Sequence, residues 1–87
     1  MAFTVHFKPS ADKALRKLPE KVQKRIVAAT EALGEDPRPP GCVKLKDDEV
    51  ELWRIRVGDY RVVYAIQDEA LIVLVVRVAH RKDVYRP

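Results

Sequence analysis

The sequence predicts an α+β fold: an N-terminal strand, a two-helix antiparallel hairpin and then an antiparallel β-meander. Apolar residues recur at helical spacing in the first half, whereas Val, Ile, Tyr and Trp crowd the chain after residue 43. Between the halves, residues 34–42 hold three prolines and two glycines and predict a loop. Helices followed by a meander of strands are typical of helices packed on a sheet.

The first strand is expected at Thr4–Phe7, before Pro9 interrupts it. Ser10 is a candidate N-cap for the first helix, which we expect to end at Leu18 because the residue before a proline is disfavoured in α geometry. Gly34 is the expected stop of the second helix. The apolar positions of the two helices are Ala11, Ala14, Leu15, Leu18, Val22, Ile26, Ala29 and Leu33.

Four strands are predicted after the loop, because β-branched and aromatic residues favour pleated structure. They are expected at residues 43–46, 50–57, 60–67 and 71–79. The last residues, 80–87, are polar and fit one helical turn or an extended tail.

Composition bounds the class of protein. Eighty-seven residues suffice for one small core, so we expect residues 1–87 to form a single domain. The sequence has no run of 18 apolar residues and no signal-peptide pattern, and Cys42 is a lone cysteine. These features predict a cytoplasmic protein without a disulfide or a zinc site. The net charge of +4 is a weak indication of an acidic partner.

The pair Gly58-Asp59 predicts a two-residue hairpin loop, because glycine takes the positive φ that such turns demand. This loop sets the cross-strand pairs Val57–Tyr60, Arg56–Arg61, Ile55–Val62, Arg54–Val63 and Trp53–Tyr64. Since side chains alternate along a strand, one face is predicted to be core: Trp53, Ile55, Val57, Tyr60, Val62 and Tyr64. The opposite face carries three arginines: Arg54, Arg56 and Arg61.

Three arginines on one face are not what stability alone favours, because like charges across a strand pair repel each other. One interpretation is that they extend into water or pair with acidic residues of segment 47–51. The other is a ligand with several phosphates, to which the forked guanidinium is well suited. We favour the second, an anion-binding site.

The last strand is harder to place in register. A turn at Asp68-Glu69 would pair Ile66 with Leu71 and set Arg61 beside Val76, with Arg77 on the opposite face as a structural or surface residue. The polar segment from His80 would then begin next to the Arg61 end of the hairpin. This arrangement would gather five residues: Arg54, Arg56, Arg61, Arg81 and Tyr85.

Two motifs in this half of the chain resemble a known family. Residues 58–64 read G-x-Y-R-V-V-Y, and residues 80–85 read H-R-K-D-V-Y. Together with the basic strand before them, they resemble RelE-type toxins of the RelE/ParE superfamily, and the predicted first half agrees. The resemblance implies a RelE-like fold and a toxin of a type II toxin–antitoxin system. Such a toxin enters the ribosomal A site and cuts mRNA by 2′-hydroxyl attack, without a metal or other cofactor.

The resemblance also implies roles for individual residues. Arg61 would stabilise charge on the reacting phosphoryl group, Arg81 would assist there or at the leaving oxygen, and Tyr85 would stack on a base or transfer a proton. His80 is a rival base, because its ordinary pKa is near neutrality. The residues expected to contact RNA or the ribosome are Lys46, Arg54, Arg56, His80, Lys82 and Arg86.

Partners and alternatives follow from the same resemblance. The expected partners are a cognate antitoxin of acidic, amphipathic character, mRNA in the A site and ribosomal RNA. Because the sequence stops at Pro87, before the C-terminal helix of many relatives, we expect a less covered apolar surface for the antitoxin: Val63, Ala65, Ile72 and Leu74. The main alternative is a ParE-like inhibitor of DNA gyrase with no nuclease activity, and another is a member that only binds RNA or its antitoxin.

Overall fold

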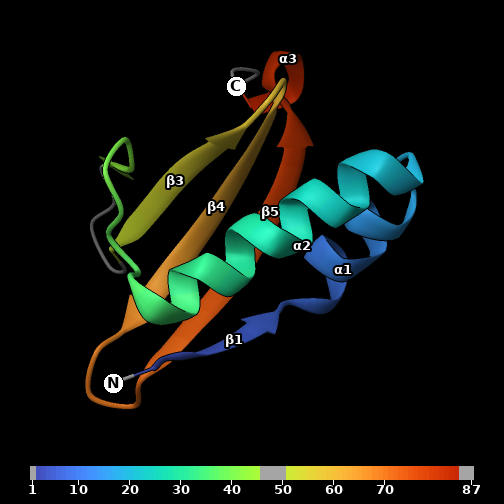
Figure 1. Cartoon of the computed structure of the whole chain (residues 1–87). Coiled ribbons are helices and arrows are strands. Elements are labelled where there is room, and N and C mark those ends of the chain that lie inside the picture. The colour runs from blue at the N-terminus through green and yellow to red at the C-terminus, as the bar shows by residue number, and fades with distance from the viewer. Residues whose placement is uncertain (1, 46–50, 85–87) are drawn as a thin grey trace.

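The computed structural model describes residues 2–45 and 51–84, and for residues 83 and 84 it describes only the backbone. In these ranges the chain forms a five-stranded sheet, two helices and a final helical turn (Figure 1). The elements are β1 (Thr4–Phe7), α1 (Pro9–Arg16), α2 (Glu20–Glu35), β2 (Val43–Leu45), β3 (Leu52–Val57), β4 (Tyr60–Gln67), β5 (Ile72–His80) and α3 (Arg81–Val84). The predicted α+β order is confirmed.

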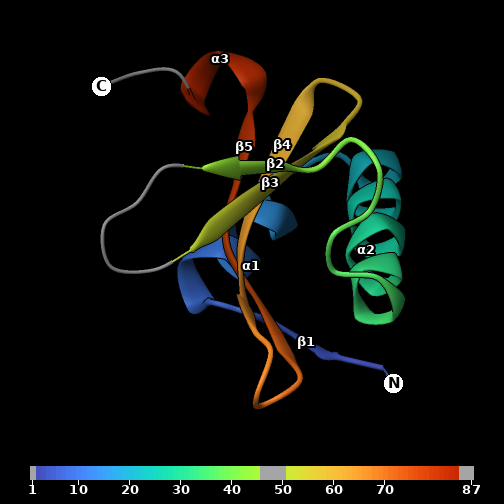
Figure 2. The same cartoon turned by 90° about the vertical axis from the view of Figure 1, so that its left-hand side faces the viewer.

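The strands lie in the order β1-β5-β4-β3-β2. Strands β2 to β5 form the predicted antiparallel meander, whereas β1 joins its far edge parallel to β5. Figure 2 shows the sheet from its edge, with α2 along one side. We call the side covered by α2 the helix face, and the opposite side, which carries Arg54, Arg56 and Arg61, the arginine face.

Helix α1 begins two residues earlier than expected. Pro9 is its first residue and Lys8 its N-cap, so the prediction of Ser10 as the N-cap is wrong. Proline suits this position because its fixed φ matches the helix and its missing N–H would have no partner in the first turn. The helix ends at Arg16, and Pro19 becomes the N-cap of α2.

Helix α2 continues through Gly34, so the predicted stop at Gly34 is also wrong. A Cβ atom on Gly34 would lie 2.9 Å from the carbonyl oxygen of Phe3, whose backbone N–H donates to the Gly34 carbonyl oxygen at 2.6 Å. Glycine is therefore needed for close approach of the β1 backbone. The helix ends at Glu35 because Asp36, which precedes Pro37, adopts an extended conformation.

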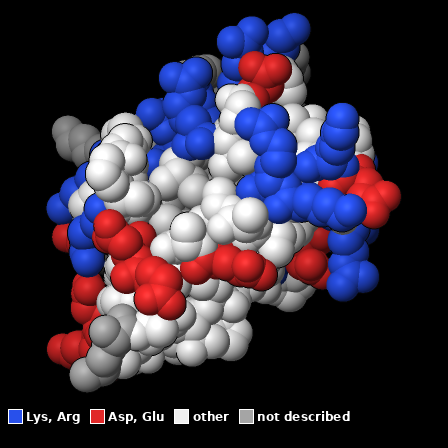
Figure 3. Space-filling view, viewed as in Figure 1, with Lys and Arg blue, Asp and Glu red and all other residues white. Residues whose placement is uncertain are grey.

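The solvent side of the two helices is rich in charge. Figure 3 shows basic side chains gathered over the α1–α2 connection, with acidic side chains between and below them. Two ion pairs at helical i,i+4 spacing lie on this surface, Arg16–Asp12 at 3.0 Å and Lys24–Glu20 at 3.6 Å. Such exposed pairs contribute little to stability, so this surface is mainly solvated. Within the described ranges, no helix is long and apolar enough to cross a membrane.

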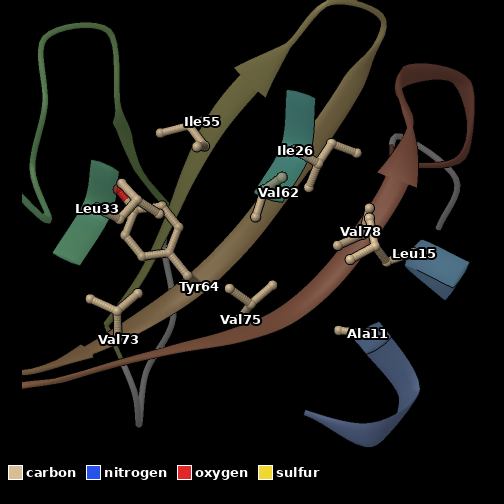
Figure 4. Close-up of a cluster of buried hydrophobic side chains, with 10 residues drawn as sticks. All are labelled: Ala11, Leu15, Ile26, Leu33, Ile55, Val62, Tyr64, Val73, Val75 and Val78. Atoms are coloured by element: carbon tan, nitrogen blue, oxygen red, sulfur yellow. The ribbon is translucent and has the colours of Figure 1, made fainter. Parts of the chain in front are cut away.

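The hydrophobic core lies between the helices and the helix face of the sheet (Figure 4). Its buried members are Ala11, Leu15, Ile26, Leu33, Ile55, Val62, Tyr64, Val73, Val75 and Val78. Tyr64 is completely buried, and its hydroxyl donates to the carbonyl oxygen of Pro37 at 2.8 Å. Burial, together with the nearby Cys42, raises the pKa of Tyr64 well above its usual range, so the phenol stays neutral. The hydrogen bond from the Tyr64 hydroxyl thus connects the loop after α2 to strand β4.

A second contact fastens the same loop. The Arg38 guanidinium makes two hydrogen bonds to the Asp68 carboxylate, at 3.2 and 3.0 Å, and lies 5.1 Å from the centroid of the Trp53 ring. This bidentate contact lowers the pKa of Asp68 and raises the pKa of Arg38. The loop is thus joined to the β4–β5 turn, at the end of the sheet away from Gly58.

Candidate nucleic-acid interface

The hairpin of β3 and β4 has the predicted register. Gly58 has a φ of 58°, in the left-handed region, and Val57 lies opposite Tyr60 across the turn. The other predicted pairs are confirmed as well: Arg56–Arg61, Ile55–Val62, Arg54–Val63 and Trp53–Tyr64. A two-residue loop that begins with a left-handed glycine is therefore sufficient to set three arginines on one face.

The three arginines differ in exposure. Arg56 is exposed, Arg54 is half-buried, and Arg61, on the central strand β4, is only 5% exposed. In the described part of the chain, the Nε of Arg54 is buried and has no hydrogen-bond acceptor. A buried donor without an acceptor costs free energy, so an incoming anion at this position would recover a lost hydrogen bond.

The arginine face is apolar away from the turn. Val63 and Ala65 lie on it by alternation along β4, and each is 6% exposed. They are buried without belonging to the hydrophobic cluster of the helix face. The expectation that Val63 and Ala65 would be less covered is therefore wrong, whereas Ile72 and Leu74 are half-buried.

The predicted register of β5 is also wrong. The turn at the β4–β5 end uses four residues, so Gln67 pairs with Ile72 and Ile66 with Val73. A β-bulge follows, because Tyr64 lies opposite Val75 whereas Val63, its neighbour, lies opposite Arg77. Val76 is thus an extra residue that reverses the alternation of β5.

The bulge changes where Arg77 lies. Residues paired across two strands share a face, so Arg77 lies with Val63 on the arginine face. The sequence had suggested the opposite face, so that prediction is wrong. The uninterrupted apolar run before Arg77 has no alternation from which its face could be predicted. Arg77 is exposed.

The end of β5 meets the hairpin turn, as predicted. Arg81 donates its backbone N–H to the carbonyl oxygen of Asp59 at 2.7 Å, and its Nε lies 4.0 Å from an Asp59 carboxylate oxygen. Figures 1 and 2 both show α3 beside the tip of this hairpin. Arg81 and Lys82 are exposed there, at the same end of the sheet as Arg56 and Arg61.

His80 is not brought to the arginines. It pairs with Tyr60, which belongs to the helix face, and the two rings meet edge to face with centroids 5.3 Å apart. Its Nδ1 accepts the backbone N–H of Lys82 at 3.3 Å. A cavity of about 510 Å³ beside α1 is lined in part by His80 and Tyr60. The imidazole therefore lies on the other side of the sheet from Arg61.

One basic residue near the turn was missed by the sequence analysis. A Cβ atom on Gly58 would lie 3.3 Å from a guanidinium nitrogen of Arg25, so this α2 side chain rests against the hairpin turn. Positive charge thus approaches the turn from the helix face as well. No motif marks this contact, because it depends on how α2 packs on the sheet. Three predicted site residues, Lys46, Tyr85 and Arg86, lie outside the described residues.

The chain is similar in sequence to known toxins. A model of the ParE toxin of type II toxin–antitoxin systems matches residues 5–85. The chain is 36% identical over 88 residues to Toxin RelG of Mycobacterium tuberculosis, covering 99% of each chain.

Solved structures are also similar to this chain, among them the following two. The archaeal RelE–RelB complex of Pyrococcus horikoshii contains a chain with a TM-score of 0.82 and 27% identity, with coverage of 93% of this chain and 97% of the other. The toxin–antitoxin complex RelBE2 of M. tuberculosis contains one with a TM-score of 0.81 and 30% identity, with coverage of 93% and 100%.

Proposed function

The chain belongs to the RelE/ParE superfamily of type II toxin–antitoxin systems, and we propose that it is a ribosome-dependent mRNA endonuclease of the RelE type. The observation that carries this proposal is the arginine face beside the hairpin turn. There the register sets Arg56 opposite Arg61, and Arg81 is joined to the turn through Asp59. A surface with several guanidinium groups suits the phosphates of an RNA strand.

The proposed reaction is an internal transfer at one phosphate of the mRNA. The ribose 2′-oxygen forms a bond to the adjacent phosphorus, and the bond from phosphorus to the 5′-oxygen breaks. The products are a 2′,3′-cyclic phosphate and a 5′-hydroxyl. Negative charge builds up on the phosphoryl oxygens and on the leaving oxygen, so catalysis needs alignment and cationic groups more than it needs a nucleophile from the protein.

Arg61 is the best placed described residue to stabilise the phosphoryl charge. It is 5% exposed, so its guanidinium acts from an environment with little water, where electrostatic interactions are stronger than in solvent. Arg54, with its unsatisfied buried Nε, would hold a phosphate next to it. Arg81, at the turn, would stabilise the leaving 5′-oxygen until water protonates it.

The proton from the 2′-hydroxyl needs an acceptor. Arginine does not serve, because its pKa stays above about 12. His80 lies on the helix face, paired with Tyr60, which favours another residue as the acceptor. From the resemblance to RelE-type toxins, we propose that Tyr85, which lies outside the described residues, accepts this proton.

We also propose a cognate antitoxin that neutralises the chain. The two similar solved structures are complexes of RelE-type toxins with their antitoxins. An antitoxin with acidic residues would match the positive charge of the arginine face and exclude RNA from it. The cytoplasm, where mRNA and ribosomes are found, is the proposed site of action.

Inhibition of DNA gyrase is the second candidate, because the matching family model describes a ParE toxin. Primer extension on a reporter mRNA after induction of the chain distinguishes the two. The nuclease predicts discrete cuts inside translated codons that disappear when translation is blocked. Growth arrest without cuts, together with loss of gyrase supercoiling in vitro, would instead establish the gyrase inhibitor.

A further inference from the structure

The β-bulge in β5 brings a fourth arginine to the arginine face, and we infer that Arg77 is a further phosphate-binding residue of this site. The inference deepens the proposed function, because it names a residue that would hold the RNA strand beside the reacting phosphate. The G-x-Y-R-V-V-Y and H-R-K-D-V-Y motifs do not include this position.

The register places the arginines in two rows that run across the strands. Arg54, Val63 and Arg77 form one row, on β3, β4 and β5. Arg56 and Arg61 belong to the next row, together with Ala79. Neighbouring strands are about 4.8 Å apart and alternate residues of one strand about 7 Å apart, so the four arginines start from one small area of the arginine face.

Val63 makes the first row a suitable subsite. It is a small apolar residue, 6% exposed, between two long cationic side chains. Arg54 on one side is half-buried and Arg77 on the other is exposed, and in this proposal both guanidinium groups bind the same anion above Val63. An RNA strand with one phosphate at Arg61 would then have its neighbouring phosphate at Arg54 and Arg77.

The bulge is what makes this arrangement possible. Val75 and Val78 both lie in the hydrophobic cluster of the helix face, although they are three residues apart. Strict alternation would put one of them on the opposite face. The extra residue Val76 allows both to remain in the core and turns Arg77 outward. A bulge interrupts the ladder of hydrogen bonds, and re-aiming an arginine toward a ligand is the role we assign to it.

The test is the salt dependence of RNA binding, measured separately from cleavage. The probe is a short fluorescent single-stranded RNA whose 2′-hydroxyls are methylated, so that it is not cut. Each phosphate contact adds about 0.7 to the slope of log affinity against log salt for a single strand. For the Arg77→Ala variant, the magnitude of this slope should be smaller than for the wild type by about 0.7. Between about 50 and 200 mM salt, its RNA affinity should therefore fall by a factor roughly 2- to 3-fold smaller than that of the wild type.

Arg16→Ala is the matched control, because Arg16 lies on α1 with a side chain that is 76% exposed. It should keep the wild-type slope, and Arg77→Lys should keep most of it, since the charge is retained. The inference is overturned if Arg77→Ala binds with the slope of Arg16→Ala, or if the wild-type chain does not bind the probe at low salt. Cleavage on ribosomes is assayed in parallel, so a chain that binds through Arg77 but does not cut would overturn only the proposed function.

Discussion

Arg56 and Arg61 lie directly opposite each other across β3 and β4, with Arg56 exposed and Arg61 buried. Like charges in facing positions of an antiparallel pair reduce stability. A surface selected for stability alone would place a neutral or acidic residue at one of the two positions. The arrangement is consistent with a site whose ligand is an anion.

Replacing Arg56 should therefore separate stability from function. We expect Arg56→Thr to raise the free energy of unfolding by a few tenths of a kcal/mol, because the facing charge is removed and threonine suits a strand. Urea denaturation measures this change. The same variant should bind single-stranded RNA more weakly than the wild type. A variant that is less stable and binds RNA unchanged would show that Arg56 has a structural role instead.

Gly58 is required for the geometry of the turn. Its φ of 58° is unfavourable for residues with a Cβ atom, so Gly58→Ala should cost about 1–2 kcal/mol of stability. It should also reduce cleavage, because the turn sets both the Arg56–Arg61 pair and the contact of Arg81 with Asp59. Asp59→Ala is the matched control and should cost less, since Asp59 has no positive φ. Equal losses in thermal unfolding for the two variants would contradict this account.

Gly34 should respond to alanine in the opposite way from an ordinary glycine of a helix. Such a substitution usually stabilises a helix by about 1 kcal/mol. Here the new Cβ atom would lie 2.9 Å from the Phe3 carbonyl oxygen, so we expect Gly34→Ala to lower the free energy of unfolding by about 1 kcal/mol or more. Denaturant unfolding gives the sign directly. A stabilised variant would mean that β1 can move away from α2 at little cost.

The Arg38–Asp68 contact predicts an effect of acid on stability. The pKa of Asp68 is lowered in the folded chain, so the carboxylate contributes stability above its ordinary pKa and loses it as the pH falls through the lowered value. Asp68→Asn should therefore be slightly less stable than the wild type near neutral pH and should approach it in acid. Unfolding midpoints measured from neutral pH to below about pH 4 test this. Parallel curves for the two proteins would rule out the contribution.

How far the sequence predicts this fold depends on the element. The register of the β3–β4 hairpin is predicted to the residue, because a two-residue loop with glycine leaves a single register. The position of Arg77 is not, because the bulge at Val76 follows from packing Val75 and Val78 together in the core. Local patterns contain no information about that packing.

The helix ends illustrate the same limit. Ser10 has a side chain suited to an N-cap, but Pro9 begins the helix before it. Gly34 suits a helix end, but its missing Cβ serves the approach of Phe3, which lies far away in the sequence. In the candidate site, the sequence predicts that the segment after β5 begins near the hairpin turn, whereas the contact of Arg81 with Asp59 and the placement of His80 on the helix face depend on the true register of β5.

The most direct test of the nuclease proposal is single-turnover cleavage of a defined mRNA on isolated ribosomes. Wild type, Arg61→Ala and the control Arg16→Ala are compared after circular dichroism has shown that all three are folded. We expect wild type and Arg16→Ala to cut in the A site and leave a 2′,3′-cyclic phosphate, and Arg61→Ala to be slower by about 10²–10³-fold. An mRNA left intact by the wild type, or cut at the wild-type rate by Arg61→Ala, would contradict the proposal.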